Sequence, residues 1–312
     1  MKKIKIDEDS FVGLRLDKFL STVLEDLSRS KIQKLLKNGG ILLNSSKAKP
    51  KHSLVLGDEI FIKDLDTTEK KLEAEDVDLD IVYEDDSCFV INKVPGVVVY
   101  PGGPGQDFTG TVANAIKNRV SDQFVDKVRL GIAHRLDKDT SGLLIIAKTP
   151  EAMKDLSAQF KARKVEKAYQ ALVWGSMEHE EGIIESPIGR NLKDRKKMMI
   201  TSVSEGKMAI SRYKVKEVFE LENNKPCSLL DVEIETGRTH QIRVHLRSIG
   251  HPVVGDSAYG DRNVNKLFKE KYNLKRQFLH ASSLSFKSPA TNKTVSLKVD
   301  LYKDLEDVLE SF

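Results

Sequence analysis

The 312-residue sequence has only two cysteines and no CxxC pair. Cys88 and Cys227 each lie inside an apolar, strand-like run, so we expect buried, reduced thiols. No apolar run approaches the roughly eighteen residues that a membrane-spanning helix needs. The start, MKKIKIDEDS, also lacks the apolar segment of a signal peptide. These absences predict a cytoplasmic protein with no membrane partner.

The seven histidines include no HxxxH pair, and none lies near a cysteine. Histidine is the commonest transition-metal ligand, but isolated histidines do not make a metal site. We therefore expect His134, His240, His245, His251 and His280 to act as hydrogen-bonding groups. No metal site is predicted.

Acidic residues are missing from one stretch although the net charge of the chain is only +4. Between residues 29 and 51 the chain has seven basic residues and no Asp or Glu, which favours a surface that faces phosphate. A strongly acidic stretch follows, containing Asp64, Asp66, Glu69, Glu73, Glu75, Asp76, Asp78 and Asp80. This shift in composition predicts an interdomain linker, with one domain at 1–72 and a second at 73–312.

The tetrapeptide RLDK occurs twice, at residues 15–18 and 135–138. In the first copy, apolar residues from Leu14 to Leu27, including Val23, recur at helical spacing, and Asp17 falls in the first turn of the predicted helix. A second helix is indicated by Ser28 as its N-cap and by Asn38-Gly39-Gly40 as its end. Short strands are expected at 41–44 and 58–63.

The segments RLDKFL, SRSKIQKLLKNGGILLN and LGDEIFI together resemble the small alpha-L RNA-binding module, over roughly residues 13–63. The resemblance implies that the basic helix and loop contact RNA phosphates. An ordinary solvated basic face is the alternative. The predicted contacts are Arg15, Lys18, Arg29, Lys31, Lys34 and Lys51.

The second RLDK precedes the apolar run Leu143 to Ala147, which is typical of a buried strand. A polar turn thus brings Asp137 to the edge of a sheet, although a charged turn of this kind is more often structural. The residues 137–140 also fit the Asp-x-Asp-x-Thr signature of haloacid-dehalogenase-like phosphatases, with Asp256 and Asp261 as a second acidic motif. Those enzymes place the motif after a buried strand, whereas here the strand follows it, so we disfavour this interpretation.

The sequence HRLDKDTSGLLIIAK closely resembles the central motif of RluA-type pseudouridine synthases, which isomerise uridine in RNA. Further segments resemble this family in the family's order: 167–173, 236–246 and 279–281. The landmark at 92–96 departs from the usual order because its proline is shifted by one place, which puts the local turn in doubt. The similarity spans about residues 80–300.

This resemblance implies roles for individual residues. Asp137 would be the essential carboxylate, acting as nucleophile or general base, and Arg238 would be the cation that keeps it ionised. Tyr169 would stack on the extruded uracil, and Arg135 would help to displace the flipped nucleotide. Arg163, Lys164 and Arg195, the last in an exposed basic loop at 191–197, could follow the RNA backbone or simply be solvated. The isomerisation oxidises and adds nothing, so no cofactor is expected.

The short apolar or alternating runs of the second domain do not alternate regularly with helical patterns. They predict an α+β class with a mostly antiparallel, mixed-sheet catalytic domain after the small α/β RNA-binding domain. Strands are expected at 81–83, 89–92, 169–174, 213–219, 228–234 and 295–299, and helices at 149–161, 239–248 and 303–311. As partner we expect structured RNA bound by a monomer. We favour large-subunit ribosomal RNA over tRNA as the substrate. The alternative function is that of a catalytically silent RNA-binding protein.

Overall fold

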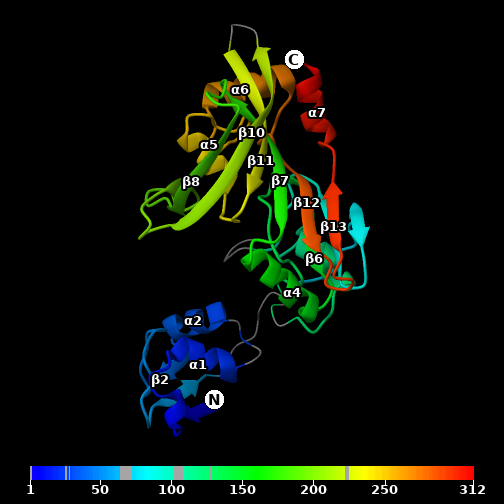
Figure 1. Ribbon diagram of the computed structural model, residues 1–312. Coiled ribbons are helices and arrows are strands. Elements are labelled where there is room, and N and C mark those ends of the chain that lie inside the picture. The colour runs from blue at the N-terminus through cyan, green and yellow to red at the C-terminus, as the bar shows by residue number, and fades with distance from the viewer. Residues whose placement is uncertain are drawn as a thin grey trace. The chain divides into compact units, whose positions relative to one another are not determined.

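The computed structural model describes residues 2–24, 27, 29–63, 72–101, 108–124, 126, 128–221 and 225–312. The chain forms two compact units, one of Met1–Leu72 with Gln123–Leu130 and one of Glu73–Asp122 with Gly131–Phe312 (Figure 1). The expected N-cap Ser28 and the linker residues Asp64, Asp66 and Glu69 lie outside the described residues.

The first unit packs two helices against a three-stranded antiparallel sheet with the order β1-β3-β2. The strands are β1 (Lys2–Lys5), β2 (Ile41–Leu43) and β3 (Glu59–Ile62), and the helices are α1 (Leu16–Val23) and α2 (Arg29–Asn38). Leu16, Leu20 and Ile32 are fully buried between them, which confirms the predicted apolar face. Leu14 and Val23 are 40% and 37% exposed, because the helix begins after the first and ends at the second.

Asp17 is fully buried at the start of α1, where it accepts five hydrogen bonds from three side chains. Arg15 donates Nε and Nη2 at 3.0 Å, Arg29 donates Nε and Nη2 at 3.1 and 2.9 Å, and Gln33 donates Nε2 at 2.6 Å. The Arg15 guanidinium, against the opposing effect of burial, holds the pKa of the Asp17 carboxyl well below its usual range. Asp17 therefore ties α1 to α2, beyond the helix-dipole contact that the sequence predicted.

The second unit is built on a 10-stranded sheet, in which nine strands follow the order β4-β5-β6-β12-β7-β11-β10-β8-β9 and the tenth, β13, pairs with β12. Among the described strand pairs, β6 with β12 is parallel and the others are antiparallel. The strands are β4 (Ile81–Glu84), β5 (Cys88–Lys93), β6 (Ser141–Ala147), β7 (Glu166–Trp174), β8 (Glu181–Arg190), β9 (Met198–Ile200), β10 (Lys207–Leu221), β11 (Lys225–Ile234), β12 (Leu279–Lys287) and β13 (Thr294–Lys298).

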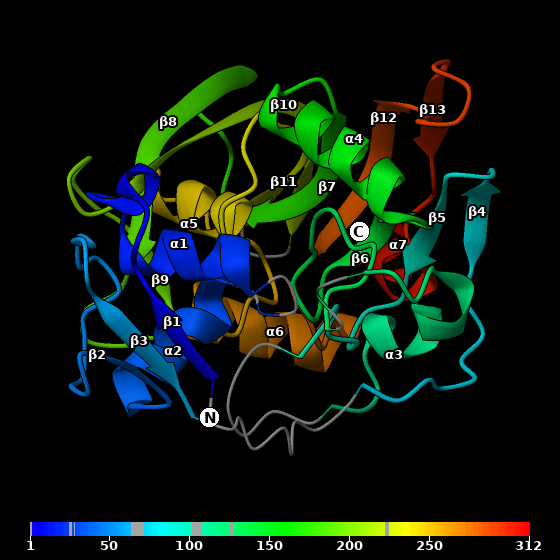
Figure 2. The ribbon, with the colours of Figure 1, turned by 90° about the horizontal axis from the view of Figure 1, so that it is seen from below.

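The helices of this unit are α3 (Val112–Ile116), α4 (Pro150–Lys161), α5 (Gln241–Ser248), α6 (Arg262–Tyr272) and α7 (Lys303–Glu310). Helix α5 lies beside the curved strands β8 and β10, where Val244 packs on Ile188 and Ala209 (Figure 2). Helices α6 and α7 share a second core with β7, β10 and β11. The sheet therefore has α5 against β8 and β10, and α6 with α7 against β7, β10 and β11.

The predicted α+β class with a mostly antiparallel, mixed sheet is confirmed. Both cysteines are free and buried, as predicted. The sequence-based prediction missed β1, β8, β9, β12, α3 and α6. None of the helices within the described ranges is long and apolar enough to cross a membrane.

We expect Asp17→Asn to lower the free energy of unfolding of the first unit by about 2 kcal/mol, because the donors Arg15, Arg29 and Gln33 lose their charged partner at a buried position. Arg15 and Arg29 keep 42% and 44% of their side chains exposed, so the cost is below that of a fully buried ion pair. Hydrogen–deuterium exchange of the α1 and α2 amides in the full chain measures this effect. Asp7→Asn, at an exposed acid of the same unit, is the control.

The sign of the pH dependence follows from the same contacts. The folded-state pKa of Asp17 is depressed, so its stabilising contribution is complete above the unfolded pKa near ~4 and is lost as the pH falls through the folded value. Wild-type protection of α1 should therefore decline on acidification, with a smaller decline in Asp17→Asn. Equal pH profiles for the two proteins would contradict this account.

Candidate active site

Asp137 begins a tight turn that leads into β6, and the Thr140 amide closes the turn by donating to the Asp137 carbonyl at 3.1 Å. Gly142 follows with φ +108°, and a Cβ at this position would lie 2.3 Å from the Ala281 carbonyl oxygen. Only glycine allows this close approach of β12 to β6. The turn therefore enters the sheet where the parallel pairing of β6 with β12 begins.

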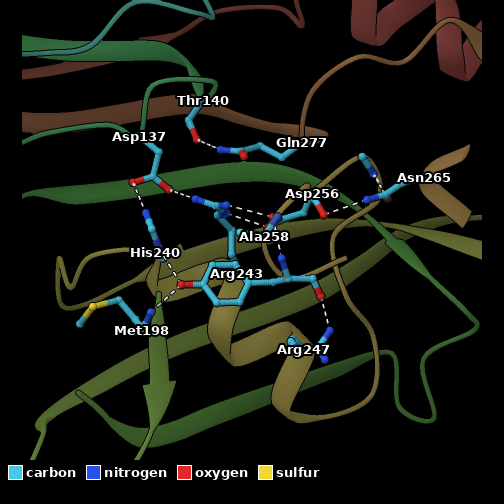
Figure 3. A network of polar contacts seen from close by, with 12 residues as sticks. Asp137, Thr140, Met198, His240, Arg243, Arg247, Asp256, Ala258, Asn265 and Gln277 are labelled. Carbon is cyan, nitrogen blue, oxygen red and sulfur yellow. Dashed lines mark hydrogen bonds and ion pairs between the residues drawn. The ribbon is translucent and has the colours of Figure 1, made fainter. Parts of the chain in front are cut away.

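Arg243 of α5 lies between two carboxylates (Figure 3). Its Nη1 donates to Asp137 Oδ2 at 2.8 Å, while Nε and Nη2 donate to Asp256 Oδ2 and Oδ1 at 2.7 and 2.9 Å. The Asp256 carboxylate is fully buried and also accepts the amides of Ala258 and Tyr259. Oδ2 of Asp137 is thus bound by the Arg243 guanidinium, whose position is fixed by Asp256.

The electrostatics of this group favour its ionised state. Burial lowers the pKa of Arg243, but the hydrogen bonds and charge of Asp256, with those of Asp137, raise it to a net value above that of a free arginine. For Asp256, burial alone would raise the pKa, and the contacts with Arg243 lower it overall. The Arg243 guanidinium also stacks 5.0 Å from the centre of the Tyr259 ring.

His240 faces the other oxygen of the carboxylate, with its Nε2 3.9 Å from Asp137 Oδ1. Its Nδ1 is 2.7 Å from the Tyr259 hydroxyl, which accepts the Met198 amide at 2.7 Å (Figure 3). The simplest assignment has Tyr259 donating to Nδ1, which leaves the proton of neutral His240 on Nε2. Burial lowers the pKa of His240 and favours this neutral form, although the Asp137 charge opposes the effect.

Lys93, at the end of β5, is 2% exposed and donates its Nζ to three backbone carbonyls. Two of these belong to Val94 and Val97 of the turn that follows, at 2.7 and 3.0 Å, and the third to Lys138, at 3.1 Å. Burial lowers the pKa of Lys93 to about 8, against the opposing charge of Asp139. The turn whose proline position departed from the family pattern is thus formed, with Gly96 at φ +83°.

Tyr169 lies on β7 with 6% of its surface exposed. Burial raises the pKa of its hydroxyl, and the negative charge of Asp137 adds to the effect. The charge of Asp137 therefore acts on the Tyr169 hydroxyl in the same direction as burial does.

Arg238 is not the cation that contacts Asp137, and the predicted pair of these two residues is wrong. Arg238 lies in an exposed loop before α5, and its Nε donates to the Met208 carbonyl at 3.2 Å. Arg243 makes the contact instead, because it lies in the first turn of α5 and its side chain is buried. The motif contained both arginines, and the apolar neighbours Ile242 and Val244 were the signal for the buried one.

The predicted RNA contacts of this unit are scattered over its surface. Arg135 is exposed two residues before Asp137, with its guanidinium 5.2 Å from the Tyr100 ring centre. Arg163 follows α4 and donates to Glu235 at 3.2 Å, so RNA would compete with this surface ion pair. Lys164 and Arg195 are exposed, the first after α4 and the second between β8 and β9.

In the first unit, Arg15 and Arg29 are partly committed to Asp17. Lys18, Lys34 and Lys51 have exposed side chains, whereas Lys31 is half-buried. The predicted RNA role of these six residues stays a prediction.

The second acidic motif of the phosphatase interpretation has other tasks in the structure. Asp256 is paired with Arg243, and Asp261 caps α6 by accepting the amides of Asn263 and Val264 at 2.8 and 3.0 Å. Across the described part of the chain, no three His, Cys, Asp or Glu side chains gather as metal ligands.

Three residues that complete the site were not predicted: Arg243, Asp256 and Tyr259. His240 was expected as a hydrogen-bonding group, whereas Arg243 and Asp256 lie in quoted motifs but were given no role in a synthase. Tyr259 comes three residues after Asp256 and carried no signal of its own. Buried polar residues inside apolar helices, such as Arg243, are the pattern that could have revealed the group.

Comparisons with known proteins point in one direction. Residues 87–248 match the family described as RNA pseudouridylate synthase, and residues 14–60 match the S4 domain. An "Uncharacterized RNA pseudouridine synthase" of Chlorobaculum parvum is 40% identical, with 95% of this chain and 93% of that protein covered. A "Ribosomal large subunit pseudouridine synthase D" of Pseudomonas aeruginosa is 38% identical, with 94% and 90% covered.

A solved structure named "Human RNA Pseudouridylate Synthase Domain Containing 1" is 28% identical and has a TM-score of 0.58, with 75% of this chain and 89% of that chain covered. The family match covers more than half of the chain, and the bacterial relatives are similar over nearly all of it. The Asp137 turn, Tyr169 and α5 all lie within the matched residues. The chain therefore belongs to the RNA pseudouridylate synthases, as an RluA-type isomerase acting on RNA with an N-terminal S4 module.

Proposed function

We propose that this synthase converts specific uridines of large-subunit ribosomal RNA to pseudouridine and that Asp137 is its essential carboxylate. The observation that carries the second part is the ion pair between Asp137 Oδ2 and Arg243 Nη1. Several bacterial relatives at 34–38% identity are named ribosomal large subunit pseudouridine synthase D, which supports the first part.

The reaction sets clear chemical demands. The bond from the sugar C1′ to N1 of the base breaks, a bond from C1′ to C5 forms, a proton leaves C5 and a proton joins N1. Electrons are only redistributed, so one carboxylate can serve as nucleophile at the sugar or as general base. Asp137 meets this demand because Arg243 occupies Oδ2, while Oδ1 has no donor closer than His240 Nε2 at 3.9 Å among the contacts described here.

Arg243 has two tasks in this proposal. Its positive charge pairs with Asp137 at Oδ2, and its fixed fork leaves Oδ1 for the substrate. Tyr169 would stack on the extruded uracil, and the exposed Arg135 would occupy the space that the base leaves in the RNA. Neither His240 nor Tyr259 is assigned a direct contact with RNA.

The basic face of the S4 unit, with Arg15, Arg29, Lys18, Lys34 and Lys51, would hold structured RNA through its phosphates. Such an added module suits a large folded RNA better than a short stem-loop. A tRNA substrate is the second candidate, and a cytoplasmic monomer stays our expectation for the enzyme.

We expect Asp137→Asn to abolish isomerisation, because the amide has neither the charge nor the basicity of the carboxylate. The measurement is release of tritium from C5 of uridine in labelled large-subunit ribosomal RNA. Asp231→Asn, at an exposed acid on β11 of the same unit, is the matched control and should stay within about threefold of wild type. Turnover by Asp137→Asn at the wild-type rate would refute the assignment.

We expect Arg243→Lys to lower the rate about a hundredfold, since a lysine cannot contact Asp137 and both oxygens of Asp256 at once. Arg238→Lys should change it by no more than about threefold, because Arg238 lies outside the group. The same tritium assay compares the two, with circular dichroism to confirm folding. Equal losses in both variants would return Arg238 to the catalytic group.

Deleting the gene should remove pseudouridine from one or a few positions of large-subunit ribosomal RNA and leave tRNA unchanged. Chemical mapping of pseudouridine in both RNA fractions measures this, with the wild-type gene or Asp137→Asn supplied in trans as controls. Loss confined to tRNA would instead favour the second candidate substrate.

A further inference from the structure

The turn that carries Asp137 is held by buried side chains from distant parts of the chain. Lys93 Nζ donates to the Lys138 carbonyl at 3.1 Å, and Arg276 Nη1 donates to the Asp139 carbonyl at 3.1 Å. Gln277 Nε2 donates to Thr140 Oγ1 at 2.9 Å (Figure 3). Three successive residues after Asp137 thus each accept one hydrogen bond from a residue that is at most 8% exposed.

Arg276 is the member of this group that depends on a further element. Its Nε and Nη2 donate to Asp304 Oδ2 and Oδ1 at 2.6 and 2.9 Å, so all three guanidinium nitrogens are engaged. Asp304 lies in the first turn of α7. Without its carboxylate, a buried guanidinium would keep only the Asp139 carbonyl among these partners and would lose its ion pair.

The start of α7 also contacts the strand that carries Lys93, the residue that donates to the Lys138 carbonyl of the turn. The Tyr302 hydroxyl donates to the Asn92 carbonyl at 2.7 Å, next to Lys93. The segment from Tyr302 to Asp304 therefore contacts both β5, which carries Lys93, and the residues before β12, which include Arg276 and Gln277.

We propose that Arg276 and Asp304 are positioning residues for the isomerisation: the first turn of α7, acting through Arg276, fixes the backbone on which Asp137 stands. This inference rests on the proposed role of Asp137. Arg243, from α5, fixes one oxygen of the Asp137 carboxylate. Arg276 fixes the main chain two residues after Asp137. The reactive oxygen is held in position only when both contacts are made. A displacement of about 1 Å at such a group costs roughly a hundredfold in rate.

The packing of α7 separates this role from a purely structural one. Leu305 and Val308 bury the helix in the core that it shares with α6, and both are fully buried. The Asp304 side chain is 47% exposed, so its substitution opens no cavity in that core. Arg276 keeps only 7% of its side chain exposed, which leaves it little surface for contact with RNA.

The test compares Asp304→Asn with Asp307→Asn, a matched change on the same helix. Asp307 is 55% exposed and pairs with Lys303 at 2.7 Å, and no described contact joins it to Arg276. Single-turnover tritium release from labelled large-subunit ribosomal RNA gives the rate, filter binding of the same RNA gives Kd, and thermal unfolding of the full chain gives stability. If mapping assigns the activity to tRNA, the labelled RNA is tRNA.

We expect Asp304→Asn to lower the single-turnover rate about tenfold with Kd unchanged, while Asp307→Asn stays within about twofold of wild type. Asp304→Glu, which keeps the charge, should recover most of the rate. Arg276→Lys should lose at least as much as Asp304→Asn, and adding Asp304→Asn to it should cost little more, because both act through one contact.

Rates for Asp304→Asn that equal those of Asp307→Asn would overturn the proposal. So would a loss that is matched by weaker RNA binding or by a lower folded fraction. Asp137→Asn, measured in parallel, keeps the two proposals apart. Activity in Asp137→Asn would refute the proposed function, whereas inactive Asp137→Asn beside fully active Asp304→Asn would refute only the role of α7.

Discussion

The Arg243 guanidinium is buried between Asp137 and Asp256, and a cation in such a place is tolerated only if every part of its surroundings is correct. The amides of Ala258 and Tyr259 must hold Asp256, and α5 must place Arg243 within hydrogen-bonding distance of Asp256. Gln241 and His245 secure α5 on β10, through the Ile210 carbonyl and the Ser211 hydroxyl. The arrangement of sheet, helix and loop thus follows from the need to satisfy one buried charge.

The two units use their arginines in contrasting ways. In the catalytic unit Arg243 and Arg276 are almost fully buried, and their charge is used to place other groups. In the S4 unit Arg15 and Arg29 are about half exposed, so the same guanidinium can neutralise Asp17 and still present surface to a phosphate. Salt should weaken the second kind of contact far more than the first.

Much of the fold could be predicted because it follows from local pattern. The helical spacing around Leu16 and the apolar run before Ala147 each correspond to the predicted element. Strand β8 could not be predicted, because EGIIESPIGR carries polar residues and a proline and is a strand only through its pairing with β10. Asn38 and Gly39 predicted the end of α2 correctly, because glycine after the last helical residue ends a helix through local backbone conformation.

The site was predicted less completely for a related reason. Asp137 and Tyr169 followed from motifs, but the choice between Arg238 and Arg243 depends on where α5 begins. That point is set by His240, whose left-handed backbone (φ 55°) turns the chain immediately before the helix. Lys93 and Arg276 are far from Asp137 in the sequence, so only the folded sheet reveals that they meet at one turn.

The parallel pairing of β6 with β12 has a consequence for the order in which the protein is made. Ser141 and His280, which face each other across that pair, are 139 residues apart. At ordinary rates of translation, roughly ten seconds separate their synthesis. When Ser141 has been added, the S4 residues and Asp137 have been synthesised, but Arg243, Arg276 and β12 have not. On this arrangement, uridine isomerisation requires the assembled catalytic unit and is beyond any shorter nascent chain.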